Sequence, residues 1–155
     1  MSRVRVVLLA SDKKDPFLEA AADYLKRAGR RYDPELVVLR PEKRGKGADD
    51  RKVRSDEARA LLAASEGAVR VALAAEGKGH DTPGFAKALE ELLARGRPLA
   101  FLIGGATGLD EELVHKADAV WSLSPLTFPH KLCALVLAEQ IYRAAEIARG
   151  GPYAK

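Results

Sequence analysis

The chain has 155 residues, of which 47% are hydrophobic and 31% are charged. This composition is typical of a soluble globular protein and excludes an intrinsically disordered chain. The net charge of +4 permits a polyanionic partner without requiring one. No apolar run approaches the roughly 20 residues that a membrane span needs, so we expect no membrane association. The length predicts one domain over residues 1–155.

Cysteine usage points to a reducing compartment. The only cysteine, Cys133, excludes an internal disulfide and a cysteine-based zinc cage. Its neighbours Leu132 and Ala134 favour a buried small hydrophobic residue over a nucleophile. Residues 1–4 run directly into a strand-like segment, so we expect no secretory signal. The sequence therefore predicts a cytoplasmic protein.

Hydrophobic periodicity predicts strands that alternate with helices in the first half of the chain. A helix begins at Asp15-Pro16 and ends near Gly29. The predicted elements are a strand at 4–9, this helix, a strand at 35–39, a helix at about 49–64 and a strand at 70–74.

The second half continues the alternation. Residues 76–81 are predicted as a loop, after which Thr82 caps a helix whose first turn holds Pro83. The predicted elements are this helix to about 95, a strand at 99–103, a short helix at 110–116, a strand at 119–122 and a helix at about 129–149.

Five strands that alternate with helices predict an α/β fold, a mostly parallel sheet flanked by helices. Ligands of such sheets bind beyond the carboxyl ends of the strands. In this chain those positions are the loops after Leu9, Leu39, Ala74, Ile103 and Ser122. Two turn-rich segments, 104–108 and 123–128, should therefore lie at one edge of the sheet.

Several common catalytic and cofactor motifs are absent from the sequence. Residues 10–14, after the first strand, lack the Gly-x-Gly-x-x-Gly turn of dinucleotide-binding proteins. There is no Walker loop and no Gly-x-Ser-x-Gly elbow. His80, His115 and His130 are too widely spaced to suggest a metal site.

The two turn-rich segments remain as candidate binding elements. Gly104-Gly105-x-x-Gly108 fits a tight strand-to-helix connection as well as it fits a flat ligand lying against the main chain. Residues 123–128 combine apolar side chains with free amides, which suit the faces and the edge of an adenine. Taken alone, this second segment is only a loop that contains a proline.

Two further features have both a plain and a functional interpretation. Lys43, Arg44 and Lys46 lie in a glycine-containing loop that is more often solvated surface, but that could close over a polyanion. His130 is expected to cap or pack the last helix, with substrate contact as the alternative. That helix carries an apolar band wider than one sheet face needs, which could serve a homodimer, at Leu132, Leu135, Val136, Ile141, Ala145 and Ala148.

Motifs along the whole chain belong together: Lys43-Arg44-Gly45-Lys46, Leu102-Ile103-Gly104-Gly105-x-x-Gly108-Leu109, Trp121-Ser122-Leu123-Ser124-x-Leu126-Thr127-x-Pro129-His130, Glu139-Gln140-Ile141-Tyr142-Arg143-Ala144 and Pro152-Tyr153. Each motif alone is weak, but the combination is specific. The chain resembles the RlmH (YbeA-type) methyltransferases, which belong to the SPOUT class.

The resemblance implies a SPOUT methyltransferase fold with a C-terminal trefoil knot, which pattern reasoning does not supply because knots are nearly absent from proteins. It implies a homodimer that uses S-adenosyl-L-methionine. The implied reaction is methylation of N3 of a pseudouridine in 23S ribosomal RNA, on the assembled 70S ribosome. Two alternatives stay open: the same fold acting on another RNA such as tRNA, and a non-catalytic ribosome-associated module.

The resemblance also assigns residues. The implied cofactor-binding residues are Leu73, Gly104, Gly105, Leu123, Ser124, Pro125, Leu126, Thr127 and Phe128. Arg143 is expected to steady a developing uridine anion or a phosphate, and His130 to accept or relay a proton. Tyr153 is the third implied catalytic residue, and Lys43, Arg44 and Lys46 are the implied RNA-binding residues.

The chain departs from the family pattern at two places. Ala154 stands where the family's tail commonly has a histidine, so any contact made by that imidazole is absent. Ala10-Ser11 follows the first strand where a glycine is often found.

Overall fold

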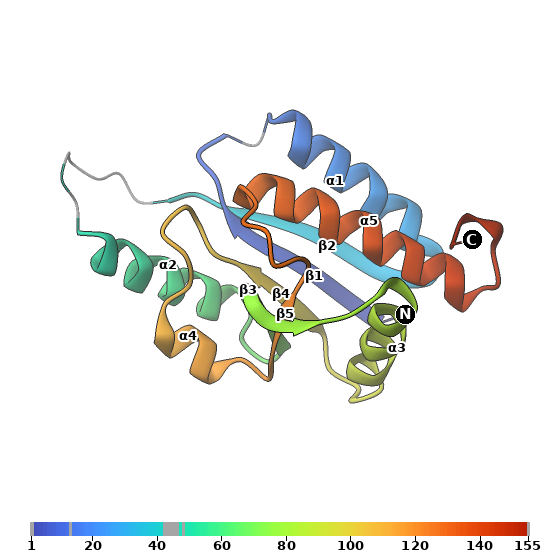
Figure 1. Cartoon of the computed structure of the whole chain (residues 1–155). Helices are drawn as coiled ribbons and strands as arrows, with labels where there is room; N and C mark the ends of the chain where they lie inside the picture. The colour runs from blue at the N-terminus through green and yellow to red at the C-terminus, as the bar shows by residue number, and fades with distance from the viewer. Residues whose placement is uncertain (1, 13, 42–46, 48, 155) are drawn as a thin grey trace.

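The computed structural model describes the chain except for residues 1, 13, 42–46, 48 and 155. It alternates strands and helices along its length (Figure 1). In chain order the elements are β1 (Ser2–Leu9), α1 (Pro16–Arg27), β2 (Tyr32–Leu39), α2 (Asp50–Ala64), β3 (Val69–Gly79), α3 (Thr82–Leu93), β4 (Leu99–Ile103), α4 (Glu111–Lys116), β5 (Ala119–Ser122) and α5 (His130–Ala148). Short 3-10 turns follow α1 at Ala28–Arg30 and end the chain at Pro152–Ala154.

The five strands form one parallel sheet in the order β2-β1-β4-β3-β5. Because β4 is central, all five of its residues are buried, which explains its uninterrupted apolar sequence. The predicted parallel α/β fold is therefore confirmed. A parallel sheet brings the carboxyl ends of its strands to one edge, and the loops at that edge are the expected ligand-binding elements.

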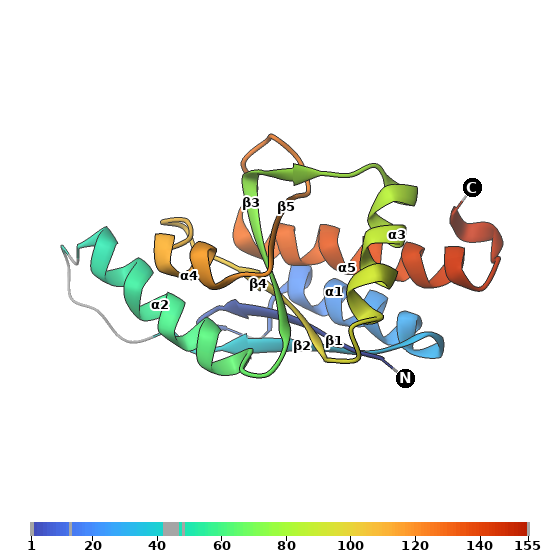
Figure 2. The same ribbon diagram turned by 90° about the horizontal axis from the view of Figure 1, so that it is seen from below.

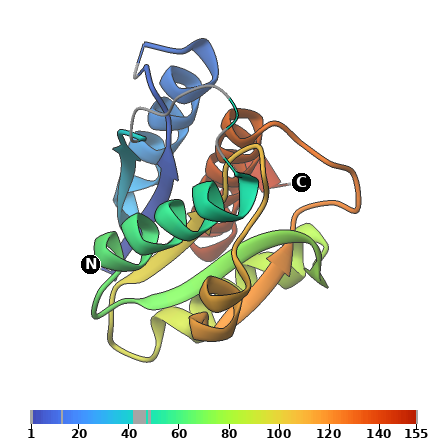
Figure 3. The same cartoon turned by 90° about the vertical axis from the view of Figure 1, so that its left-hand side faces the viewer.

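Helices cover both faces of the sheet. On one face α1, α3 and α5 pack over a hydrophobic core that includes Phe85, Phe101, Trp121 and Leu137. On the other face, α2 and α4 cover a smaller core through Leu61 and the side chains of α4. Figure 2 shows the two helix layers on opposite sides of the strands, and Figure 3 faces the edge where the carboxyl ends meet.

The prediction of a loop at 76–81 is wrong, because β3 continues to Gly79. Its pairing with β5 is interrupted after Leu73 and resumes where Lys78 faces Trp121. At Gly77 a Cβ atom would lie 2.7 Å from the backbone carbon of Trp121, so only glycine lets the two strands approach this closely. Figure 2 shows the resulting bend in β3.

The prediction that Thr82 caps α3 is also wrong. The side chain of Asp81, not of Thr82, accepts a hydrogen bond from the amide of Gly84 at 2.8 Å. The Thr82 hydroxyl instead lies 3.0 Å from Oε1 of Gln140, to which it donates. Thr82 therefore ties α3 to α5, a contact between residues far apart in sequence.

Lys43, Arg44 and Lys46 lie outside the described residues. The trefoil knot and the division of the chain into one domain stay predictions. No helix in the described part of the chain is both long and apolar enough to cross a membrane.

Candidate functional site

A cavity of about 590 Å³ lies beyond the carboxyl ends of β3, β4 and β5. Its size is within the range of small-molecule sites. It is lined by residues 73–76 of β3 and by the connections after β4 (103–109) and β5 (123–130), and Val114 and Cys133 complete the wall. The connections that follow β4 and β5 meet at the edge that Figure 3 faces. This confirms the expectation that the two turn-rich segments lie together.

The glycines after β4 are required by the shape of the turn. A Cβ atom on Gly104 would lie 2.8 Å from Cδ2 of Leu109 and 3.0 Å from the carbonyl oxygen of Gly108. The amide of Gly108 donates to the carbonyl oxygen of Gly105 at 3.0 Å, and Gly108 has a φ of +86°. The predicted tight connection is therefore confirmed, and the same turn forms a wall of the cavity.

Helix α2 supports this turn from the side away from the cavity. Nη1 of Arg54 donates to the carbonyl oxygen of Thr107 at 3.3 Å. A Cβ atom on Gly105 would lie 2.7 Å from Oε2 of Glu57, so the glutamate carboxylate rests against this glycine. Arg54 and Glu57 are three residues apart and share one face of the helix. Sequence analysis missed both, because charged residues on an amphipathic helix are ordinarily solvated.

The segment before α5 contributes most of the remaining wall. The Ser122 hydroxyl donates to the carbonyl oxygen of Ser124 at 2.9 Å, and the Ser124 hydroxyl accepts from the amide of Leu126 at 3.0 Å. These bonds form a compact turn in which the Leu126 side chain is 69% exposed. All the implied cofactor-binding residues line the cavity except Pro125.

His130 lines the cavity at the first position of α5. The capping interpretation is wrong, since Pro129 occupies the cap and makes no side-chain cap bond. Burial lowers the pKa of His130, and so does the nearby Lys131, while the backbone of Leu9 and the Asp15 carboxylate act in the opposite direction. The imidazole is therefore neutral at pH 7 and can accept a proton.

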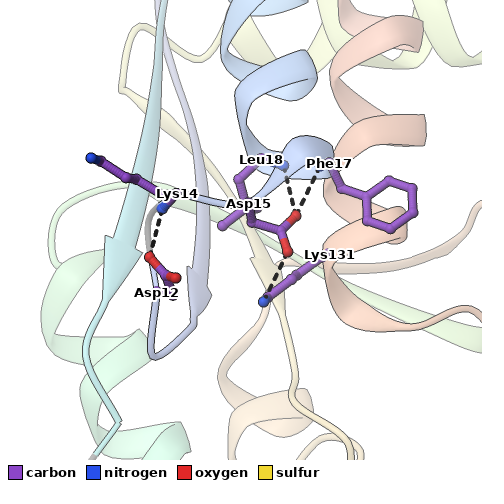
Figure 4. A network of polar contacts seen from close by, with 6 residues as sticks. All are labelled: Asp12, Lys14, Asp15, Phe17, Leu18 and Lys131. Carbon is purple, nitrogen blue, oxygen red and sulfur yellow. Dashed lines mark hydrogen bonds and ion pairs between the residues drawn. The ribbon is translucent and has the colours of Figure 1, made fainter.

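The beginning of α5 is anchored to the beginning of α1. Asp15 accepts hydrogen bonds from the amides of Phe17 and Leu18, and its other oxygen lies 3.1 Å from Nζ of Lys131 (Figure 4). Burial opposes ionisation of Asp15, but the bonds from Lys131, Leu18 and Phe17 lower the pKa of its carboxyl. Because His130 precedes Lys131, this ion pair also fixes the histidine at the rim of the cavity.

Arg143 and Tyr153 do not line the cavity of their own chain. Arg143 is 13 residues beyond His130 on α5, about 20 Å along the helix axis. Its Nε donates to both oxygens of Glu139, and its guanidinium lies 4.8 Å from the centre of the Tyr153 ring. The Tyr153 ring in turn packs edge-on against the Tyr142 ring, with 4.6 Å between the ring centres. The structure thus brings the two residues together, but far from the other implied site residues.

Cys133 lines the cavity and is only partly buried as a residue. Burial of the thiol raises its pKa to about 11, so the thiol stays protonated and is a poor nucleophile. Among the residues that the structure describes, no three His, Cys, Asp or Glu side chains are grouped to hold a metal ion.

A parallel α/β fold with a glycine-walled cavity at the carboxyl edge of its sheet is typical of ligand-binding proteins. Comparison of the sequence with known families identifies which class of these proteins the chain belongs to. The family model described as predicted SPOUT methyltransferase matches residues 2–154, and the chain belongs to this family. A relative from Alkalilimnicola ehrlichii, named ribosomal RNA large subunit methyltransferase H, is 41% identical over 97% of each chain. One of the same name from Stenotrophomonas maltophilia is 42% identical, over 94% of this chain and 96% of the relative.

Solved structures share the fold at much lower identity. A putative methylase family protein from Neisseria gonorrhoeae is 16% identical, with a TM-score of 0.55 over 91% of this chain and 82% of that chain. A probable methylase family protein from Haemophilus influenzae has a TM-score of 0.60 at 11% identity, over 99% of this chain and 71% of that chain. Together with the family match, these structures confirm the predicted SPOUT class.

Replacing Gly104 with alanine should destabilise the protein, because the new methyl group meets Leu109 and the backbone of Gly108. We expect Gly104→Ala to lower the free energy of unfolding by about 1–3 kcal/mol, measured by urea denaturation. Gly79→Ala is the control, since nothing lies within 4 Å of its Cβ position. Equal stabilities of the two variants would show that the turn does not need Gly104.

Proposed function

We propose that this protein transfers a methyl group from S-adenosyl-L-methionine to N3 of a pseudouridine in 23S ribosomal RNA. The substrate is the assembled 70S ribosome and the location is the cytoplasm. The observation that carries the proposal is that the implied cofactor residues, all but Pro125, line one cavity although they come from β3 and from the connections after β4 and β5. Near-full-length similarity to ribosomal RNA large subunit methyltransferases H supports the choice of substrate.

The cavity fits the chemistry of S-adenosyl-L-methionine. Gly104 and Gly105 present bare main chain, and Leu73, Leu123 and Phe128 are apolar, which suits the flat faces of an adenine. Backbone amides in the connection before α5 would bond the edge of the base, so the residues implied by sequence would hold the adenosine. When bound, this cofactor supplies a methyl group that is already activated by the sulfonium.

The residues around the cavity then have two tasks, alignment of the nucleophilic nitrogen and removal of its proton. Neutral His130 is the proton acceptor at the rim of the cavity. Arg143 stabilises the anion that develops on the base, and Tyr153 fixes the orientation of the Arg143 guanidinium through their stacked contact.

A homodimer reconciles these roles with the distance between them. Since about 20 Å of α5 separates Arg143 from His130, the Arg143 and Tyr153 that serve one cavity come from the partner subunit. The apolar band of α5 leaves surface for such an interface. Its members Ile141 and Ala145 are buried within the chain, but the other four are not. Those left partly or largely exposed are Leu132, Leu135, Val136 and Ala148.

Lys43, Arg44 and Lys46 are the proposed RNA-binding residues. These residues belong to the connection between β2 and α2, which starts at the carboxyl edge of the sheet after Leu39. The cavity lies at the same edge of the sheet as Leu39, where this connection begins, which supports a role for the connection in holding RNA phosphates.

The function is tested by radiolabelled methyl transfer to 50S subunits, 70S ribosomes and tRNA, with the modified nucleoside identified by mass spectrometry. We expect label in N3-methylpseudouridine of 23S RNA from 70S ribosomes. Label in tRNA would favour the same fold acting on that RNA. Absence of both transfer and S-adenosyl-L-methionine binding would favour a non-catalytic ribosome-associated module.

Replacing Arg143 with alanine should slow methyl transfer roughly 10²-fold, because a charge that stabilises the anion is lost. Calorimetric binding of S-adenosyl-L-methionine should stay largely unchanged, because the proposed partner of Arg143 is the RNA base and the cavity residues that would hold the cofactor are unaltered. Arg95→Ala removes an exposed arginine that pairs with Asp118 and serves as the control. Unchanged turnover of Arg143→Ala would remove this residue from the site.

The proton-acceptor role of His130 predicts a particular pH profile. Because burial lowers the pKa of the imidazole, its neutral form persists as pH falls to the ordinary value of 6.5, and the methylation rate should decline only below that pH. His130→Ala should slow the reaction about 10²-fold and abolish this decline. If the methylation rate of His130→Ala still declines at low pH as in the unaltered protein, another group accepts the proton.

A further inference from the structure

Glu76 is the only acidic residue among the described residues that line the cavity, and none of those residues is lysine or arginine. The surrounding wall is mostly apolar side chain and bare main chain. A single carboxylate in such a wall gives the cavity a negative potential, which favours a positively charged ligand. We propose that the Glu76 carboxylate contacts a cationic group of the methyl donor and is a cofactor-binding residue.

The bend in β3 places Glu76 at the cavity. Pairing between β3 and β5 is interrupted between Leu73 and Lys78, so Glu76 lies in the stretch that leaves the ladder. The next residue, Gly77, is held against the backbone of Trp121 at a distance that admits no Cβ atom. The backbone beside Glu76 is therefore fixed by strand packing. A binding side chain on such a rigid element starts from a fixed position.

Nothing in the described part of the chain uses this carboxylate for stability. Glu76 has no hydrogen bond or ion pair there, unlike Glu139 and Glu146, which pair with Arg143 and Arg149. Glu76 is also exposed, so its side chain contributes little to packing. Glu76 lines the cavity, its backbone is fixed by strand packing, and its carboxylate has no partner in the described part of the chain, so it is available to a ligand.

The ligand's own charges determine what Glu76 contacts. This inference rests on the proposed function, because S-adenosyl-L-methionine carries a permanent positive sulfonium and an α-ammonium group. Either group is attracted to a carboxylate, and a hydrogen bond or ion pair to a charged group has a large effect on affinity. The adenosine part carries no charge, so it gains nothing from the negative charge of Glu76.

Three ligands distinguish the two charged groups by isothermal titration calorimetry. S-adenosyl-L-methionine has both cations, S-adenosyl-L-homocysteine has only the ammonium, and 5′-methylthioadenosine has neither. Glu76→Gln keeps the shape and removes the charge, and should weaken S-adenosyl-L-methionine about 10-fold or more while leaving 5′-methylthioadenosine unchanged. If Glu76→Gln leaves the affinity for S-adenosyl-L-homocysteine unchanged, the carboxylate contacts the sulfonium. If the affinity for S-adenosyl-L-homocysteine falls as much as that for S-adenosyl-L-methionine, the carboxylate contacts the ammonium.

Glu66→Gln is the matched control. Glu66 is exposed in the turn between α2 and β3, at the opposite edge of the sheet, and its replacement changes the net charge by the same amount. Glu76→Asp keeps the charge and should keep the preference for S-adenosyl-L-methionine over 5′-methylthioadenosine.

Two outcomes would overturn the inference. In one, Glu76→Gln binds S-adenosyl-L-methionine as tightly as the unaltered protein. In the other, its affinity for 5′-methylthioadenosine falls as much, which would mean an uncharged contact or a change of shape. Failure of the unaltered protein to bind S-adenosyl-L-methionine would be a different result, since it contradicts the proposed function itself.

Discussion

The close approach of main chain to main chain at Gly104 is the constraint on which the site depends. Gly104 lies against Gly108 and Leu109 with no space for a side chain, which lets β4 turn sharply at the carboxyl edge of the sheet. The turn has the cavity on one side and Arg54 of α2 on the other. A site built mostly from main chain suits methyl transfer from an activated donor, because that reaction depends more on alignment than on reactive side chains.

Much of the fold could be predicted from sequence because hydrophobic patterns and strand burial agree. The bounds of β4 and β5 match the prediction, since each is a short apolar or β-branched run between clear turn residues. The extension of β3 to Gly79 could not be predicted, because Glu76-Gly77-Lys78-Gly79 has the composition of a loop. Its strand conformation depends on β5, a partner that lies more than 40 residues later.

Sequence motifs group residues by function, but they do not show which of those residues lie close together in one folded chain. The meeting of the two turn-rich segments, 104–108 and 123–128, could be predicted, because parallel strands align their carboxyl ends. Arg143 and Tyr153 share a motif region with His130, yet the 19-residue helix α5 separates them as a rigid rod. The contacts of Arg54 and Glu57 with the turn after β4 were missed, because each arises from tertiary packing of a residue that looks solvated in sequence.

The most direct test of the account is to map S-adenosyl-L-methionine on the protein by nuclear magnetic resonance. Backbone amide shifts would be compared before and after addition of the ligand. The account predicts that the largest changes fall on Gly104, Gly105 and residues 123–128, around the cavity. Changes confined to another surface, or none at saturating ligand, would contradict the claim that this cavity binds the methyl donor.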